Sequence, residues 1–200
     1  MSEETRQHIV EACFETLREE GFTGTTARSI ARRGGFNSAL IFYYFGTLDA
    51  LLLAVLDHSS GLRMQRYSAA VAQAHTPEEL AQVAADIYGE DLERGYITVF
   101  SELVGASLAR PELGEEIVRR SEPWIDLVES AVRKALAGSP LAALAPPRDL
   151  ARLVITLYLG INLFSRMDPD GSGMESLFGL AAQAAPLLSA LSGPDRLRGS

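Results

Sequence analysis

Residues 21–56, GFTGTTARSIARRGGFNSALIFYYFGTLDALLLAVL, decide how the N-terminal part of this chain folds. Glycines divide the stretch, and a threonine, asparagine or serine stands just before each helical run of apolar residues. Because glycine ends helices and these polar side chains cap them, the stretch predicts two short helices followed by a long one. Thr25 or Thr26 caps the first short helix, and Asn37 or Ser38 caps the second.

The two short helices have the spacing of a helix-turn-helix. Their apolar residues recur so that both helices can pack on a preceding amphipathic helix; they are Ile30, Ala31, Phe36, Ile41 and Phe45. In a helix-turn-helix the first helix lies across the DNA backbone and the second inserts its N-terminal half into the major groove. The pattern therefore predicts DNA binding, although an ordinary helical corner of an all-α protein has the same spacing.

The charge of the chain is unevenly distributed. Residues 1–20 contain six glutamates and two arginines, whereas residues 21–48 contain Arg28, Arg32 and Arg33 and no acidic residue, in a chain of net charge -8. The sequence pI of about 4.9 argues against general coating of nucleic acids. A local basic segment can still dock on phosphates, and the alternative is that the three arginines form a solvated face.

Tyr43 and Tyr44 are adjacent in the second short helix. Successive residues of an α-helix point about 100° apart, so both rings cannot face the core. At least one ring is therefore expected on the surface, next to the basic segment, where it favours a contact surface.

This N-terminal stretch resembles the DNA-binding domain of the TetR family of bacterial transcriptional regulators. The similarity covers about 50 residues, or a quarter of the chain, and no single residue carries it. The features that carry it are the Gly21-Phe22 pair, the Thr25-Thr26 start, Arg28, the Ile30-Ala31 pair, Gly35, the aromatic run ending in Tyr44-Phe45, and Leu51 to Leu56. The resemblance implies a homodimer, a palindromic operator in double-stranded DNA, and repression that is usually relieved by a small-molecule effector.

The resemblance also implies which residues contact DNA. They are Thr26 and Arg28 on the first short helix and Ser38, Ala39, Leu40, Phe42, Tyr43 and Tyr44 on the second.

Three positions depart from the family pattern: Leu48 replaces a common lysine, Ala39 a common glycine, and Phe42 a common tyrosine. The loss of the lysine and of one hydroxyl removes groups that anchor phosphates, so we expect weaker or less salt-sensitive DNA binding. Arg32 and Arg33 can compensate.

The remainder of the chain also has the pattern of helices, and no stretch alternates like a strand. We expect an all-α fold of about nine helices. Residues 1–46 would form a three-helix helix-turn-helix DNA-binding domain, and residues 47–200 a helical bundle for ligand binding and dimerisation.

Two helices near the C-terminus are expected to form a dimer interface. The helix predicted over Arg148–Met167 is apolar on nearly all sides, which predicts burial all round, and a last helix is predicted over Met174–Leu191. Together with the same pair from a second copy they would form a four-helix interface, although they could instead complete a monomer core. The interface residues are Leu153, Leu157, Ile161, Leu177, Leu180, Ala184 and Leu188.

A ligand pocket is expected between helices of the C-terminal part. Its candidate lining residues are Met64, Tyr67, Tyr88, Phe100, Glu102, Trp124, Tyr158 and Asn162. Aromatic residues and methionine at helical spacing also occur in plain cores. Glu102 and Asn162 are polar exceptions that need partners, and a mostly apolar effector can supply them.

Other functional classes lack their motifs. The three histidines are far apart, and the sequence has neither a phosphate-binding glycine loop nor a nucleophile elbow, so no enzyme, metal or cofactor is expected. The turn Asp168–Gly173 has only the beginning of a calcium loop, because Gly179 stands where a bidentate glutamate is required. The apolar run from Leu153 to Phe164 is too short to span a bilayer, and one cysteine without a signal peptide points to the cytoplasm.

Two functions therefore remain open. One is a dimeric transcriptional regulator, expected to be a repressor that a small effector releases from DNA. The other is a helical protein for small-molecule binding or protein interaction, whose DNA affinity is weakened by Leu48 and Phe42.

Overall fold

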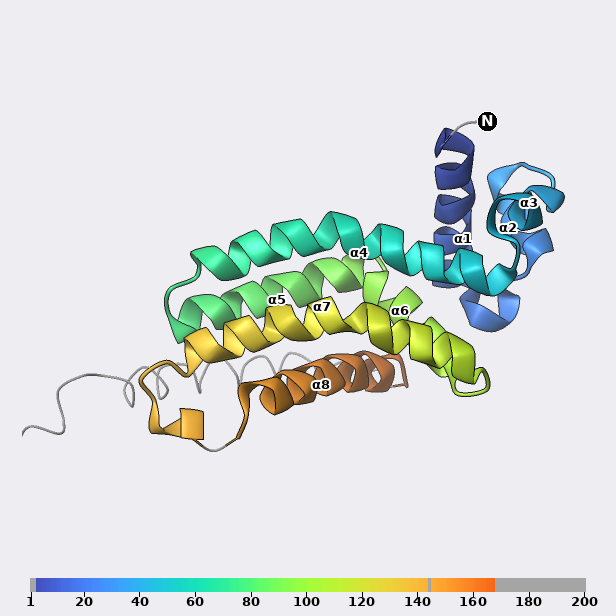
Figure 1. Ribbon diagram of the computed structural model, residues 1–200. Coiled ribbons are helices and arrows are strands. Elements are labelled where there is room, and N and C mark those ends of the chain that lie inside the picture. Colours follow the sequence, from blue (N-terminus) through green and yellow to red (C-terminus); the bar gives the residue numbers. More distant parts are fainter. Residues whose placement is uncertain (1–2, 144, 168–200) are drawn as a thin grey trace, which may run out of the picture. The chain divides into compact units, whose positions relative to one another are not determined.

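The computed structural model is all-helical in the residues it describes, which are 3–143 and 145–167 (Figure 1). Eight α-helices and one short 3-10 helix occur in these residues, in agreement with the predicted all-α fold. They are α1 (Glu3–Gly24), α2 (Ala27–Gly34), α3 (Ala39–Phe45), α4 (Leu48–Gln73), α5 (Pro77–Glu93), α6 (Tyr96–Ser107), α7 (Pro111–Ala135), η1 (Pro140–Ala143) and α8 (Pro147–Met167).

The chain divides into two compact units. Among the described residues, unit 1 comprises 3–63 and 92–121, and unit 2 comprises 64–91, 122–143 and 145–167. Unit 1 therefore contains α1, α2, α3 and α6 with the first parts of α4 and α7, whereas the predicted DNA-binding domain ends at residue 46. The units are a division by packing, and the functional boundary between residues 46 and 47 stays a prediction.

The core of unit 1 forms around α1, which packs against α2 and α6. Buried side chains from six helices meet there, among them Ile9, Leu17, Ile30, Ile41, Leu51, Val55, Leu103 and Ile117. Burial of this apolar surface stabilises the unit by roughly 25 cal/mol for each Å² removed from water. Ile30 and Ile41 belong to this core, as the helix-turn-helix pattern predicts.

Cys13 belongs to the same core. Its side chain is buried among the apolar residues of α1 and its neighbours, and it forms no disulfide. Burial raises the pKa of the Cys13 thiol to about 12, because the thiolate is poorly solvated there. The side chain is therefore a small apolar filler and not a nucleophile.

Polar contacts tie α6 and its C-terminal turn to the break near the end of α1. Gly21 adopts φ 66°, and the amide of the next residue, Phe22, donates a 2.9 Å hydrogen bond to Glu102 of α6. The guanidinium of Arg110 lies 4.8 Å from the centre of the Phe22 ring and donates a 2.7 Å hydrogen bond to Asp49 at the start of α4. These contacts fix the connection that leads into α2.

Unit 2 packs the second parts of α4 and α7 against α5. Val71, Ala74 and Leu80 are buried there against Leu127 and Ala131. The ammonium of Lys134 on α7 donates to the carbonyls of residues 71, 72 and 74, which have no further turn of α4 to bind. A cation in this position also offsets the negative end of the α4 dipole.

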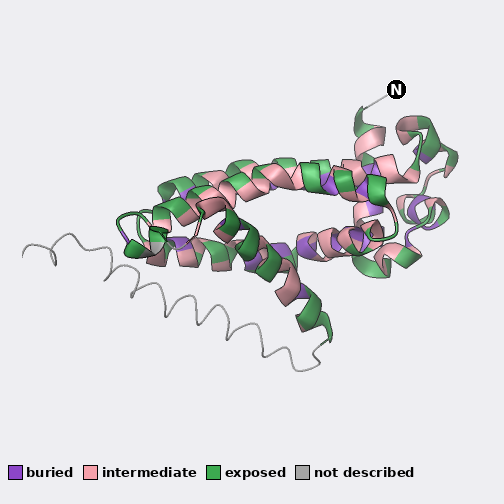
Figure 2. Ribbon diagram, turned by 60° about the horizontal axis from the view of Figure 1, so that its bottom comes forward, coloured by how far each residue is buried: buried purple, intermediate pink, exposed green. Residues whose placement is uncertain are grey.

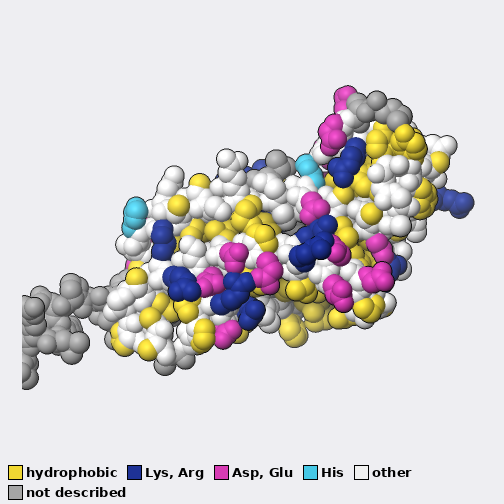
Figure 3. Space-filling view, viewed as in Figure 1, with side chains coloured by type: hydrophobic (Ala, Val, Ile, Leu, Met, Phe, Trp, Pro, Cys, Tyr) yellow, Lys and Arg dark blue, Asp and Glu magenta, His cyan; other side chains and the backbone are white. Residues whose placement is uncertain are grey.

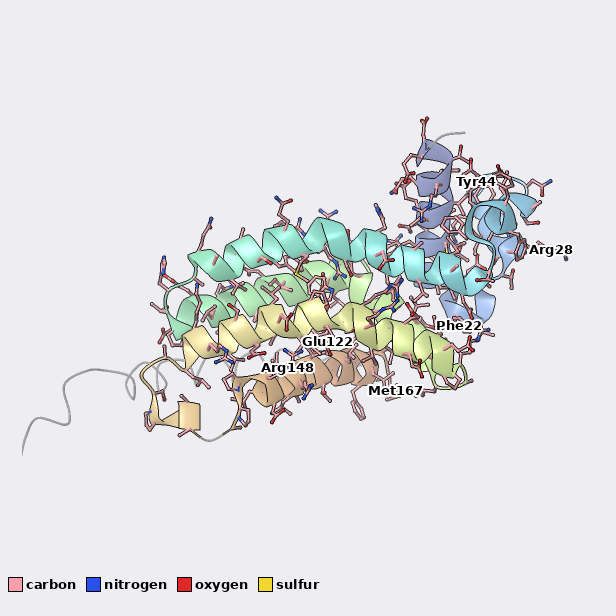
Figure 4. All side chains as sticks on the ribbon, viewed as in Figure 1. Phe22, Arg28, Tyr44, Glu122, Arg148 and Met167 are labelled. Carbon is pink, nitrogen blue, oxygen red and sulfur yellow. The ribbon has the colours of Figure 1, made fainter. Side chains whose placement is uncertain are left out.

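Ion pairs connect α8 to α7 within unit 2. Arg148 donates to Glu122, to Asp126 at 2.8 Å and to Glu129 at 3.0 Å, and Figure 4 shows Arg148 and Glu122 facing each other. The carboxylates raise the pKa of the Arg148 guanidinium further above its already high ordinary value. The surface in Figure 3 shows basic and acidic side chains gathered together in this way.

Little of the helix α8 is buried within the single chain. Only Ala151 and Asn162 of this helix are buried, and Leu153, Leu157 and Phe164 are 54%, 51% and 69% exposed. Figure 2 shows the same helix, which leads into the grey trace, largely in green and pink. Within the chain the helix packs on α7 and α5 along one side. Cover of the remaining apolar side by a second copy stays a prediction.

The predicted last helix and the turn Asp168–Gly173 lie outside the described residues, as do Leu177, Leu180, Ala184 and Leu188. By length and composition alone, α8 could cross a membrane, and so could α3 and α4 if taken as one bent span. The apolar run from Leu153 to Phe164 is only part of this helix. An apolar helix that packs against protein passes the same test, so this composition is weak support for a span.

Candidate DNA-binding surface and effector site

The first helix of the predicted helix-turn-helix begins at a capping box. Thr26 is the N-cap of α2: its side chain accepts a 3.0 Å hydrogen bond from the Ser29 amide, and the Ser29 hydroxyl accepts a 2.8 Å bond from the Thr26 amide. This reciprocal pair satisfies two amides that would otherwise lack partners at a helix start. Of the two threonines that the sequence left open, Thr26 is therefore the cap.

The turn between α2 and α3 depends on two glycines. Gly35 adopts the left-handed conformation at φ 68°, which glycine reaches without strain. A Cβ on Gly34 would lie 2.2 Å from the Phe36 ring and 3.0 Å from the Cβ of Ala12. The His8 side chain of α1 hydrogen-bonds the Gly34 carbonyl at 2.7 Å, so α1 holds the turn from the other side.

The second helix is capped by a residue before its first turn. The Asn37 side chain accepts a 2.9 Å hydrogen bond from the Ala39 amide, whereas Ser38 occupies the N-cap position without a side-chain bond. Thr47 similarly accepts from the Ala50 amide and starts α4. The sequence thus identified both candidate caps of α3, and the structure divides the role between them.

The helix α3 has one buried and one exposed face. Ile41 is fully buried, and Leu40, Tyr44 and Phe45 pack partly against the core of unit 1. Phe42 and Tyr43 are 51% and 63% exposed, although large apolar and aromatic side chains usually avoid water. The expectation that Tyr43 and Tyr44 cannot both be buried is confirmed, since Tyr43 projects outward and meets the Tyr44 ring edge-on.

The basic residues of α2 differ in how closely they are paired with acidic residues. Arg33 donates a 2.7 Å hydrogen bond to Glu19, and this hydrogen bond lowers the pKa of the Glu19 carboxyl. Arg32 lies 3.5 Å from Glu20. Arg28 is exposed, and the part of the chain that the structure describes offers it no ion pair (Figure 4). Of the two arginines expected to compensate for Leu48, Arg33 is therefore engaged with α1, and Arg32 lies near the same helix at a longer distance.

Unit 2 contains a cluster of aromatic rings around a buried carboxylate. Asp91 on α5 is buried and accepts hydrogen bonds from the hydroxyls of Tyr67 and Tyr158, the first at 2.7 Å. The Tyr88 ring meets the Tyr158 ring edge-on, and the Tyr67 ring meets the Trp124 ring in the same manner. Burial, followed by the bond to Asp91, raises the pKa of Tyr67 above its ordinary value, so its hydroxyl stays a donor.

A hollow of about 670 Å³ lies beside this cluster, between α4 and α7. It is lined by Met64, Ser68, Val71, Ala72, Pro123, Asp126, Leu127, Ser130 and Lys134. The lining combines five apolar residues with two serines, one carboxylate and one ammonium.

Comparison with known proteins identifies the family of this chain. The family described as bacterial regulatory proteins, tetR family, matches residues 9–55, which run from α1 into α4. A curated relative, the HTH-type transcriptional repressor Rv3405c of Mycobacterium tuberculosis, is 30% identical over 177 residues, covering 88% of this chain and 82% of that protein. The chain belongs to the TetR family.

Solved structures agree with this fold. FadR from Bacillus subtilis in complex with stearoyl-CoA matches with a TM-score of 0.72 at 15% identity, over 90% of this chain and 96% of that one. The multidrug binding protein EbrR complexed with imidazole matches with a TM-score of 0.64 at 21% identity, over 99% and 100%. The family match and the curated relative make the chain a TetR-type transcriptional regulator. Its relatives are regulators and not enzymes, in line with the prediction.

For this TetR-family protein, the eight residues predicted to contact DNA all lie in one unit. Arg28, Ala39, Phe42 and Tyr43 are exposed, whereas Leu40 and Tyr44 are half-buried. Leu48, where the family commonly has lysine, packs against the core of unit 1. Its role is therefore structural, and the anchoring charge is absent from that position.

The residues predicted to line the effector pocket divide between the units. Tyr67, Tyr88, Trp124, Tyr158 and Asn162 belong to unit 2 and fill space with one another, and of the eight only Met64 lines the hollow.

Phe100 and Glu102 belong to unit 1. Phe100 packs on its core, and Glu102 binds the Phe22 amide. Glu102 therefore contacts the segment that leads into the helix-turn-helix, within the same unit. Glu102 and Phe22 are 80 residues apart in sequence, and no local sequence pattern indicates this contact.

Asp91 is the functional candidate that the sequence reasoning missed. It stands among the acidic residues of the segment Asp86–Glu93, so nothing distinguished it as the buried one. The described residues contain no group of three or more histidine, cysteine or carboxylate side chains that could hold a metal ion.

Proposed function

We propose that this TetR-type regulator is a repressor that binds a palindromic operator as a homodimer and is released by a small, mostly apolar effector in the cytoplasm. The exposed face of α3 carries the proposal. Phe42 and Tyr43 are more than half exposed, whereas the preceding residue, Ile41, is fully buried in the core of unit 1. A rigid helix that presents large side chains outward is the form in which helix-turn-helix proteins read the major groove.

The effector part of the proposal rests on unit 2. An aromatic cluster with two tyrosine hydroxyls on a buried carboxylate, next to an open hollow, combines apolar lining with a few fixed polar groups. Binding sites for small molecules have this composition. Proteins of similar fold hold small molecules, imidazole in one case and stearoyl-CoA in another. The long acyl chain of stearoyl-CoA supports a ligand with a substantial apolar part.

The dimer part rests on α8. Leu153 and Leu157 lie on the same side of the helix, are more than half exposed, and are accompanied by Val154 and Phe164. Monomeric proteins rarely leave an apolar stripe of this kind in water, and a second copy would cover it. Ile161 is half-buried and continues the stripe.

A mobility-shift titration on the DNA that flanks the protein's own gene tests the DNA-binding part. Tyr43→Ala should weaken specific binding by about 1–3 kcal/mol and leave thermal unfolding unchanged, because the ring is exposed. Arg28→Ala should lower the affinity for all sequences alike and flatten the salt dependence. Ile41→Ala is the control. Truncation of this fully buried side chain should lower the free energy of unfolding by about 2–5 kcal/mol.

The alternative function, a helical binding protein with weakened DNA affinity, is favoured by the loss of the anchoring group at Leu48. It predicts no sequence-specific shift at any salt concentration, together with a melting temperature that small apolar compounds raise. A specific shift that an apolar compound reverses supports the repressor, and a specific shift that none reverses contradicts the effector part.

A further inference from the structure

The DNA-reading helix of this protein has no positive charge of its own. Residues 34–62, which include α3 and the first half of α4, contain neither lysine nor arginine. Phosphate contacts supply most of the affinity of a protein for DNA, and base contacts supply the specificity. Cations for the phosphates next to α3 must therefore come from other helices of unit 1.

Five arginines of residues 3–48 are candidates, and two of them are engaged in short ion pairs. Arg18 lies 2.6 Å from Glu15 and Arg33 lies 2.7 Å from Glu19, whereas Arg32 lies 3.5 Å from Glu20. Arg28 and Arg32 on α2 remain, together with Arg6, the fourth residue of α1.

The structure brings Arg6 to the C-terminal end of α3. Its guanidinium lies 5.0 Å from the centre of the Phe45 ring, which is the last residue of that helix. A cation over an aromatic face is attracted by the ring and held in place by it. The side chain is nonetheless 43% exposed, so part of it is accessible from solvent.

The acidic neighbour of Arg6 binds it weakly. Glu3 lies 3.7 Å away, beyond hydrogen-bond distance, and its own side chain is almost fully exposed. An exposed pair of this kind contributes about 0–1 kcal/mol. A phosphate, which a guanidinium binds with two parallel hydrogen bonds, would displace it.

We propose that Arg6 of α1 is a DNA-phosphate contact of this protein, fixed by the Phe45 ring beside the reading helix. The inference rests on the proposed function only in that α3 faces the DNA. It adds α1 to the DNA-binding surface, in addition to the eight residues that the sequence identified on α2 and α3. The lost anchor at Leu48 is then replaced from another helix of the same unit.

The test is the salt dependence of duplex binding by the full chain. Two duplexes of equal length are used, the DNA that flanks the protein's own gene and a scrambled sequence. Arg6→Gln should reduce the slope of log K against log salt by about 0.9 for each protomer bound, on both duplexes. For a bound dimer, the ratio of the affinity of the unmodified protein to that of Arg6→Gln should fall about 12-fold between about 50 and about 200 mM salt.

Two further variants separate a phosphate contact from a brace for α3. Arg6→Lys keeps the charge and should keep the slope. Arg18→Gln is the matched control on the same helix, since Arg18 is engaged with Glu15, and should leave the slope unchanged. If Arg6 only braces α3, the Arg6→Gln variant should have a lower melting temperature. It should also bind more weakly by the same factor at every salt concentration, so the slope would not change. That result overturns the proposal.

The proposal and the proposed function fail in different ways. A reduced slope without preference for either duplex upholds Arg6 and contradicts sequence-specific repression. A specific shift whose slope Arg6→Gln does not change upholds repression and contradicts Arg6. Absence of salt-dependent binding to both duplexes contradicts the two together.

Discussion

At the scale of single residues, Gly34 and Gly35 determine whether α2 and α3 can meet at their turn. The two glycines act by different means: Gly35 by its left-handed backbone and Gly34 by the absence of a side chain next to Phe36 and Ala12. The sequence predicted that small residues are needed at this turn. It could not predict which neighbour excludes a side chain, because Ala12 comes from a helix that precedes the turn by more than 20 residues.

Gly34→Ala should destabilise unit 1 by about 1–3 kcal/mol, because the added methyl would overlap the Phe36 ring. Gly89→Ala is the control: apart from its chain neighbours and the local helix backbone, nothing lies within 4 Å of the added methyl, and alanine favours the helix α5. Urea unfolding measures both variants. An unchanged urea midpoint for Gly34→Ala would show that the ring can move aside and that the turn tolerates a side chain.

Glu102 shows the limit of sequence reasoning about a single residue. A carboxylate in an apolar helix was a reasonable candidate to bind a ligand, since buried acids need partners. Its partner is the Phe22 amide at the break in α1. Only the packing of α6 on α1 brings these two residues together, and no periodicity in the sequence reports it.

At the scale of helices, the boundaries of α1 to α7 follow from caps and breakers that are visible in the sequence. The relation between α5 and α8 does not. Asp91 and Tyr158 are 67 residues apart, and their hydrogen bond ties the two helices together in unit 2. The tyrosines were identified as aromatic candidates, but the carboxylate that orders them was not.

Tyr158→Phe should cost about 1–3 kcal/mol of unfolding free energy, because it removes a donor from a buried carboxylate. Tyr43→Phe is the matched control, since it removes a hydroxyl from an exposed ring and should change stability little. Denaturant titration of both variants checks the difference. Equal stability of the two would mean that the Tyr158 hydroxyl contributes no more than a surface group.

At the scale of the whole molecule, the exposed stripe of α8 predicts association. Leu157→Glu places a charge in the proposed interface, where it would be desolvated without a partner, and should shift the protein from dimer to monomer. Light scattering after size exclusion measures the shift, and operator affinity should fall with it. Arg152→Gln on the same helix is the control. A dimer that persists unchanged in Leu157→Glu would place the interface elsewhere.

The ion pairs predict how stability depends on pH. Hydrogen bonds from Arg33, Arg120 and Arg133 lower the pKa values of Glu19, Glu116 and Glu129, respectively, below their ordinary value of 4.5. These carboxylates therefore stabilise the folded state above pH 4.5, and the contribution is lost as the pH falls through their lowered pKa values.

The urea midpoint should accordingly fall between about pH 5 and about pH 3, and high salt should reduce this change because the pairs are exposed. Glu19→Gln should make the fall of the urea midpoint with pH smaller, by the part that Glu19 contributes. A midpoint that rises as the pH falls in this interval would contradict the assignment.

The buried position of Cys13 gives the protein a natural reporter. A thiol-reactive dye can reach this side chain only when α1 separates from its neighbours, and the chain offers no second cysteine that would obscure the signal. The labelling rate of the unmodified protein thus follows local opening of the segment that supports the turn at Gly34. Operator DNA that holds this segment in place should slow the labelling, without any engineered probe.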